Sequence, residues 1–148
     1  MCVTCAMFNP FGGDWLHAAE TERTIEETGL PGGDAPDGPD PTVQLEVGDT
    51  VNGVLDVPGD WDWFYVEFEA GFTYTVTMTP GTLDDPLIGI ADAAGNPLFG
   101  VDQGFSGESE VYVFVAETSG SGYIVADSFW NTVAPSDPNY FPDTGTYS

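Results

Sequence analysis

Residues 72–79 read FTYTVTMT, an alternation of large apolar side chains with threonine. Successive side chains of a β-strand point to opposite faces of a sheet, so this pattern predicts a strand with one buried face and one exposed face. Just before it, residues 62–69 (DWFYVEFE) place Phe64, Val66 and Phe68 on one face of a second strand. We expect residues 69–71 to join these two strands as a short hairpin.

Further apolar runs, separated by glycine and proline turns, lie on both sides of this pair. They recur at the spacing of about 8–12 residues that is typical of all-β sandwiches, and they predict strands over residues 50–56, 86–91, 97–101, 109–116, 121–128 and 144–148. Residues 42–148 are therefore predicted to form an all-β fold, an antiparallel, jelly-roll-like β-sandwich of about eight to nine strands. Because the last strand is so short, we expect the domain to be truncated within it.

Residues 1–41 differ in composition and are predicted to be a leader that precedes the sandwich. Residues 15–28 (WLHAAETERTIEET) have an incomplete apolar stripe, which predicts a short and marginal helix. Residues 29–41 (GLPGGDAPDGPDP) are mainly glycine, proline and aspartate, and we expect a linker that does not pack. The start of the chain lacks the basic and apolar regions of a secretory signal peptide.

The charge balance excludes several classes of function. Among 148 residues there are 25 acidic side chains and one basic one, Arg23, for a formal net charge of −24. Such a surface repels phosphate groups, so neither nucleic acid nor an anionic membrane is expected as a partner. The chain has one histidine and no motif of a zinc peptidase, serine hydrolase or nucleotide-binding loop, so we expect no enzyme activity. A glycosidase using paired carboxylates is the remaining enzymatic alternative.

Acidic side chains in the predicted loops make calcium the expected ligand. Calcium takes about six to eight oxygen ligands, and the candidates next to predicted strands are Asp60, Asp62, Asp85, Asp92 and Asp102. The alternative is that these aspartates cap turns by accepting hydrogen bonds from nearby backbone amides.

Two other groups of residues are candidate binding sites. Trp61, Trp63 and Tyr65 share the face opposite Phe64, where they would stack on sugar rings or bind an extended peptide if exposed, or form core if covered. Cys2, Cys5 and His17 are candidate zinc or redox residues. The alternative for the cysteines is two thiols without a function in the leader.

Seven short motifs resemble the bacterial pre-peptidase C-terminal (PPC) domain in their order and spacing. They are VGDTVNGVL (47–55), GDWDWF (59–64), EAGFTYTV (69–76), LDDPLIGI (83–90), DAAGNPL (92–98), SGSGYIV (119–125) and TGTY (144–147). The resemblance covers roughly residues 43–148. The leader also resembles that of marine bacterial proteins in which such a domain precedes a serralysin-like metalloprotease and calcium-binding (RTX-type) repeats.

The resemblance implies a non-catalytic accessory module of a secreted bacterial peptidase-like protein. Such a module would aid substrate binding, or the folding and secretion of an attached catalytic domain, and it would bind calcium in some relatives. Its partners would be that catalytic domain, or a protein or glycan polymer. The resemblance also implies an extracellular protein that is secreted without an N-terminal signal peptide. The alternative function is a carbohydrate-binding module that uses the Trp61, Trp63 and Tyr65 face.

Overall fold

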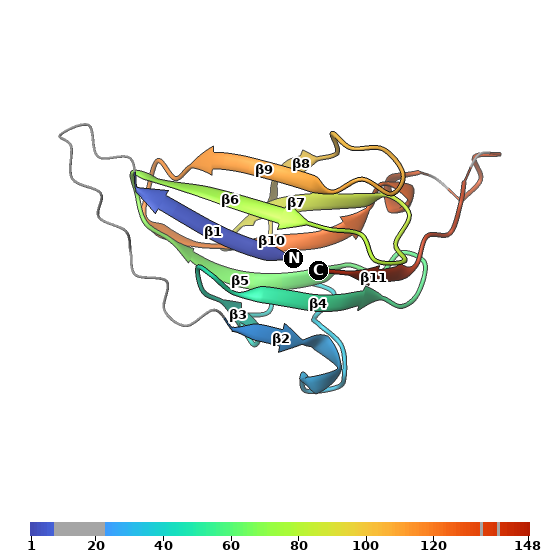
Figure 1. Ribbon diagram of the computed structural model, residues 1–148, viewed down its shortest axis with the longest axis horizontal. Helices are drawn as coiled ribbons and strands as arrows, with labels where there is room; N and C mark the ends of the chain where they lie inside the picture. Colours follow the sequence, from blue (N-terminus) through green and yellow to red (C-terminus); the bar gives the residue numbers. More distant parts are fainter. Residues whose placement is uncertain (8–22, 134, 139) are drawn as a thin grey trace.

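Two β-sheets pack face to face in the computed structural model of the protein, which describes residues 1–7, 23–133, 135–138 and 140–148 (Figure 1). The six-stranded sheet contains β1 (Cys2–Met7), β2 (Thr24–Glu26), β4 (Thr50–Leu55), β6 (Phe72–Met78), β9 (Glu110–Val115) and β11 (Gly145–Tyr147). The five-stranded sheet contains β3 (Gln44–Leu45), β5 (Asp62–Phe68), β7 (Pro86–Asp92), β8 (Pro97–Val101) and β10 (Gly120–Ser128). The predicted all-β sandwich is confirmed.

The core lies between the sheets, where the alternating apolar side chains of both layers meet. Phe64 and Val66 of β5 and Val76 and Met78 of β6 are all buried there, as their alternation predicts. The threonines of β6 lie on the opposite face and are half-buried. Each predicted strand from residue 50 onward is present, with its ends within two residues of the expected bounds.

The strand pairing differs from the prediction in three respects. The described residues form eleven strands, and two of the pairings are parallel, β2 with β4 and β3 with β5, so the sheets are mixed. The hairpin predicted at residues 69–71 is wrong, because β5 pairs with β3 and β10 whereas β6 pairs with β1 and β9. Residues 69–71 instead carry the chain from one sheet to the other, with Gly71 at a positive φ of 86°. Alternation identifies a strand's inner face but does not name its neighbour.

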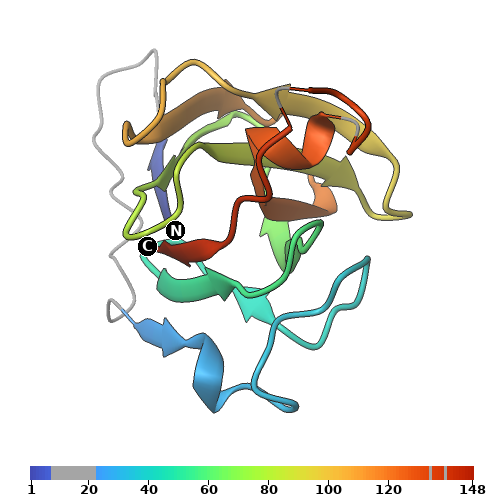
Figure 2. The same cartoon turned by 90° about the vertical axis from the view of Figure 1, so that its right-hand side faces the viewer.

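The segment predicted to be a leader contributes to the sandwich, which corrects the predicted boundary at residue 41. β1 lies between β4 and β6, and it pairs with β6 from Cys2↔Thr77 to Met7↔Phe72. Met1 and Val3 are completely buried in the core. β11 also pairs with β4, and the two ends of the chain lie close together (Figures 1 and 2).

The predicted helix and linker are also corrected. Residues 15–22 lie outside the described part of the chain, and the rest of the predicted helix forms β2 and a 3-10 turn, Glu27–Gly29. Its Thr24–Ile25 pair is β-branched and suits a strand beside β4. The linker does pack, since Ala35 is buried in the core and the Trp63 N–H donates a 3.0 Å hydrogen bond to the Pro36 carbonyl.

A second 3-10 turn, Phe129–Thr132, follows β10. β2 and the turn after it lie on one side of the sandwich, and the edge strands β8 and β9 lie on the opposite side (Figures 1 and 2). Within the described ranges, no helix has the length and apolar character needed to cross a membrane.

Candidate metal site

Acidic side chains from separate parts of the sequence converge where β5 begins. Glu27 opens the first 3-10 turn, Asp34 and Asp37 lie in the loop that follows, and Asp60 and Asp62 bracket the start of β5. These side chains form two overlapping groups of three. Within each group, one carboxylate oxygen from each residue lies within 4.8 Å of those from the other two. The two groups are Glu27–Asp34–Asp62 and Asp34–Asp37–Asp60, and they share Asp34. We call these five residues the acidic site.

Asp62 is the innermost member of the acidic site, with an exposed fraction of 0%. The Tyr147 hydroxyl of β11 donates a 2.5 Å hydrogen bond to its Oδ2 atom. Its Oδ1 atom is buried and has no hydrogen-bond partner within the described residues. Burial raises the pKa of Asp62 to about 9, and the nearby Glu27 charge adds to this effect while the Tyr147 hydrogen bond opposes it. An unpartnered buried carboxylate oxygen is costly unless a proton or a bound cation compensates it.

Glu27 is held by the backbone on both of its oxygens. Oε1 accepts a 3.1 Å hydrogen bond from the Ala35 N–H, and Oε2 accepts a 2.5 Å hydrogen bond from the Val54 N–H. Burial raises the pKa of Glu27, although these two backbone hydrogen bonds oppose the rise. Each carboxylate oxygen has a second lone pair, so Glu27 can still bind a cation while these bonds hold it in place.

Close packing of Tyr147 on Gly53 brings β11 to the acidic site. A Cβ atom at position 53 would lie 2.3 Å from the Tyr147 ring, so any larger residue there would displace the ring. Tyr147 is itself buried, with an exposed fraction of 2%. The phenol is therefore fixed with its hydroxyl against Asp62.

The outer part of the acidic site is held by the loop before β5. Asp60 is buried, and its Oδ2 atom accepts a 2.7 Å hydrogen bond from the Asp56 N–H. The Asp60 carbonyl accepts a 2.9 Å hydrogen bond from the Asn131 side chain, which ties this loop to the second 3-10 turn. Burial is the main cause that raises the pKa values of Asp60 and Asp34, and neighbouring carboxylates raise both further.

The arrangement brings carboxylates together without a basic side chain among them. Like charges at such short separations repel strongly in a partly buried site. Either a shared proton or a bound cation relieves this repulsion. Oxygen-only ligands are those that hard divalent cations such as calcium prefer.

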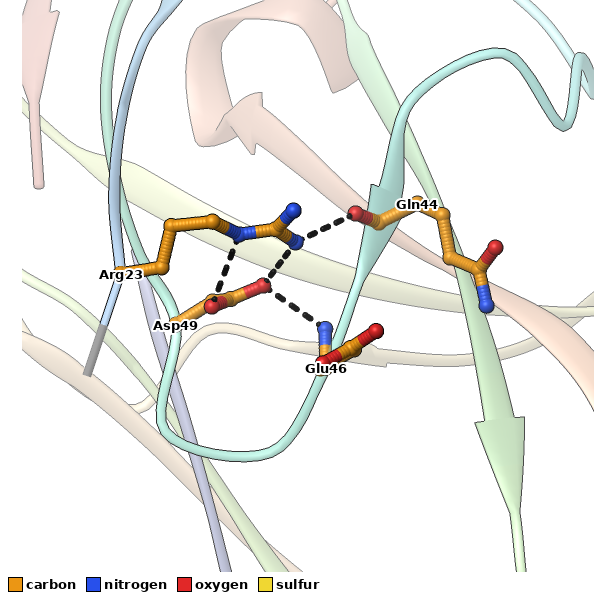
Figure 3. A network of polar contacts seen from close by, with 4 residues as sticks. All are labelled: Arg23, Gln44, Glu46 and Asp49. Atoms are coloured by element: carbon orange, nitrogen blue, oxygen red, sulfur yellow. Dashed lines mark hydrogen bonds and ion pairs between the residues drawn. The ribbon is translucent and has the colours of Figure 1, made fainter. Parts of the chain in front are cut away.

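Arg23, the basic side chain, is engaged elsewhere (Figure 3). Its guanidinium donates hydrogen bonds of 3.2 Å and 2.5 Å to the two carboxylate oxygens of Asp49 and one of 3.1 Å to the Gln44 carbonyl. Asp49 is buried, and it also accepts a 2.8 Å bond from the Glu46 N–H. This network joins the start of β2 to the turn between β3 and β4.

Replacing Arg23 with glutamine is expected to lower the free energy of unfolding by about 1–2 kcal/mol, because the buried Asp49 carboxylate loses a charged partner. The loss stays small because the Arg23 side chain is half exposed and the Glu46 amide still binds Asp49. Urea unfolding measures the change. A loss above about 3 kcal/mol would show that the network has a larger role than these contacts support.

The other predicted calcium ligands do not join the acidic site. Asp92 caps the turn after β7, where Oδ1 accepts hydrogen bonds from the Ala94 and Asn96 amides, and these bonds lower its pKa. Asp85 immediately precedes β7 and Asp102 immediately follows β8, and the two lie near each other. Burial is the main cause that raises the pKa of each carboxyl group, and nearby acidic charges raise both pKa values further. Asp85 has a buried Oδ1 atom without a hydrogen-bond partner within the described residues.

The predicted aromatic face is present on the outer surface of the five-stranded sheet. Trp61 has an exposed fraction of 45%, and Tyr65 is half-buried. Trp63 is only 6% exposed, because it packs with Ala91, Tyr123 and Val125 on that outer surface and not because the second sheet covers it.

The candidate zinc or redox residues are only partly described. Cys2 has a free, half-buried thiol in β1. The side chain of Cys5 and the whole of His17 lie outside the described residues, so this interpretation stays a prediction.

Sequence reasoning placed Asp60 and Asp62 in a metal site but missed Glu27, Asp34 and Asp37. These three lie in the segment assigned to a helix and a linker. The available signal was the density of aspartate in residues 29–41, which is unusual for a linker that only spans a distance.

No protein-family model matches the chain. A search of curated proteins gives no match either.

Proposed function

We propose that this chain is a non-catalytic accessory module of a secreted bacterial peptidase-like protein, and that it binds calcium at the acidic site. The observation that carries the calcium proposal is the buried Oδ1 atom of Asp62, which has no partner within the described residues and lies among other carboxylates. Glu27, Asp34 and Asp62 would form the inner ligand set. Asp37 and Asp60 would complete it or hold a second ion with Asp34.

The donor atoms favour calcium over other cations. All of the grouped side chains are carboxylates, without the nitrogen or sulfur ligands that zinc and copper select. Magnesium demands a small, nearly octahedral shell and keeps several waters, whereas calcium accepts irregular shells of carboxylates and carbonyls. A site built partly from a loop, residues 30–43, suits the more permissive ion.

Calcium would fasten the N-terminal segment to the sandwich. Glu27 and Asp34 belong to that segment, while Asp62 lies on β5 and is bonded to Tyr147 on β11. One ion would therefore connect three parts of the chain that are far apart in sequence. Extracellular calcium modules have dissociation constants of about 10⁻⁴–10⁻³ M, so folding would be completed only outside the cell.

The non-catalytic role is supported by the inventory of reactive groups. The sequence has no motif of a zinc peptidase, serine hydrolase or nucleotide-binding loop, and its arginine is bound to Asp49. The resemblance to PPC domains supports an attached catalytic domain as the partner and an extracellular location. Purified protein should therefore hydrolyse neither peptides nor glycosides, and turnover of either by the isolated chain would contradict this role.

Calcium titration of the purified chain by calorimetry tests the metal proposal. The wild type is expected to bind calcium, and Asp62→Asn and Asp34→Asn should each weaken binding by about tenfold or more, because each removes an ionic ligand. Asp92→Asn is the matched control, since Asp92 caps a turn outside the site, and it should bind like the wild type. Absence of calcium binding in the wild type, or an equal loss in the Asp92 variant, would overturn the proposal.

A further inference from the structure

We propose that the outer face of the five-stranded sheet binds an uncharged glycan polymer. This inference goes beyond the accessory role and does not depend on calcium. It rests on a row of aromatic rings that is exposed at Trp61, two hollows beside the row, an open position at Gly100 and a fixed carboxylate.

The aromatic rings form a continuous row across β5 and β10. The Trp61 and Trp63 ring centroids are 6.4 Å apart, those of Trp63 and Tyr123 are 5.6 Å apart, and those of Tyr123 and Tyr65 are 5.8 Å apart. The last two pairs pack edge to face, which fixes the ring orientations. Trp63 and Tyr123 in the middle of the row are only 6% and 4% exposed, so a linear polymer would contact Trp61, which is 45% exposed, and the half-buried Tyr65.

A hollow lies beside each end of the row. The first has a volume of about 340 Å³ and lies beside Trp61 and Trp63, between β10 and the edge strand β8. The second has a volume of about 500 Å³ and lies beside Tyr65, where β5 ends and β10 begins, with Ser119 and Ser121 in its lining. Both volumes fall in the range of small-molecule sites, about 300–1,000 Å³.

Two glycines give the first hollow its floor. Gly89 of β7 and Gly100 of β8 are directly opposite each other in the strand register, and both line the hollow. A Cβ atom at Gly100 would meet no heavy atom within 4 Å, so this position is open space above the sheet. A larger side chain at Gly100 would fill the space that a ligand needs, whereas a Cβ atom at Gly89 would lie 3.1 Å from the Val125 Cβ atom.

Polar groups in the first hollow suit hydroxyl partners. Thr132 lines the hollow, and its hydroxyl donates a 2.6 Å hydrogen bond to the Phe129 carbonyl, so the hydroxyl oxygen can still accept from a ligand. Asp127 lines the same hollow and is the only ionisable group in its lining. Its Oδ1 atom accepts 2.7 Å hydrogen bonds from the Ser128 amide and the Asn131 side chain, which fix the carboxylate. A single fixed carboxylate beside the Thr132 hydroxyl is suited to sugar hydroxyls.

Charge determines which kind of polymer fits. The lining of the first hollow contains no basic side chain, and the whole chain carries a net charge of −24, so uronic acid polymers, sulfated polymers and acidic peptides are repelled. The single carboxylate is already bound to two donors, which makes it a poor partner for a run of lysine or arginine. The first hollow therefore suits an uncharged polymer, and polylysine tests the alternative that Glu67 and Glu69, which line the second hollow, bind a basic chain.

Strand order favours a glycan over an extended peptide. β5, β10 and β7 are interior strands of their sheet, with β3 and β8 at the edges, so their backbone groups are already paired. A peptide that adds to a sheet needs a free edge. Recognition on this face must come from ring stacking and side-chain hydrogen bonds, which is the way sugar rings are bound.

Affinity electrophoresis with native gels tests the proposal, using soluble uncharged β-glucans and glycol chitin as probes, with calcium present throughout. The wild-type protein should be retarded by at least one uncharged polymer and not by alginate. Trp61→Ala and Gly100→Val should each reduce the apparent affinity by about tenfold or more. Gly100→Val fills the hollow without a clash in the protein, so thermal unfolding should confirm that it remains folded.

Phe105→Ala is the matched control, because Phe105 is an aromatic residue that is 77% exposed and lines neither hollow. It should bind like the wild type. Three results would overturn the proposal: no retardation by any uncharged polymer, an equal loss in the Phe105 variant, or retention by polylysine alone. Because calcium binding is measured separately, a failure here leaves the metal proposal standing and identifies the face as the part in error.

Discussion

Replacing Val3 with aspartate is expected to lower the free energy of unfolding by at least about 3 kcal/mol, because the change places a charge in the core without a partner. Val3 has an exposed fraction of 0%, and it lies in β1 between β4 and β6. Its backbone N–H and carbonyl also bond to Asp49 and Gly48 at 3.3 Å and 2.7 Å. Urea or thermal unfolding measures the loss.

Val113→Asp is the matched control for this change. Val113 lies on β9 with an exposed fraction of 57%, so a new charge there meets water, and the effect should stay within about 0.5 kcal/mol. If the Val3 variant were as stable as the Val113 variant, residues 1–7 would not form the strand described above.

Calcium is expected to raise the melting temperature by about 5–10 °C when it is present at about 100 times its dissociation constant. That excess stabilises a folded protein by about 2.7 kcal/mol, and about 1 kcal/mol shifts the melting temperature of a chain of this size by about 2–4 °C. Differential scanning calorimetry with calcium and with a chelator measures the shift. Asp62→Asn should remove most of it.

The pH dependence of this calcium effect has a defined sign. Burial raises the pKa of Asp62 from its ordinary value of 3.8 to about 9, so in the calcium-free protein the folded state holds a proton that the unfolded chain has lost. Calcium-free stability is therefore fully present below pH 3.8 and declines as pH rises toward 9, by at most about 1.4 kcal/mol per pH unit. Calcium replaces this proton, so its stabilising effect should be larger at about pH 8 than at about pH 6. A calcium effect that is equal or smaller at the higher pH would contradict this mechanism.

The strand positions follow from the sequence, but the pairings do not. Alternation along β6 correctly identifies Val76 and Met78 as core, because side-chain direction in a strand is a local property. Neighbour choice depends on contacts far apart in sequence. β5 and β6 are separated by three residues and nevertheless belong to different sheets. For the same reason, β1 could not be recognised from a stretch of seven residues that lies distant in sequence from its partners.

The candidate site was likewise only partly predictable from the sequence. Asp60 and Asp62 were predictable because two carboxylates flank the start of a clear strand. Glu27 and Asp34 were not, because their role depends on a turn and a loop that fold back onto β5. The outward direction of Trp63 was also predictable, whereas its burial was not. That burial comes from Tyr123 and Val125 of β10, which are distant in sequence.

A crystal structure of the protein grown with calcium, with anomalous diffraction data, tests the calcium assignment most directly. We predict an anomalous peak between the carboxylates of Glu27, Asp34 and Asp62, with the Oδ1 atom of Asp62 as one of its ligands. A calcium-containing crystal in which these carboxylates are close together and share no ion, or in which calcium binds only at Asp85, Asp92 or Asp102, would contradict the account.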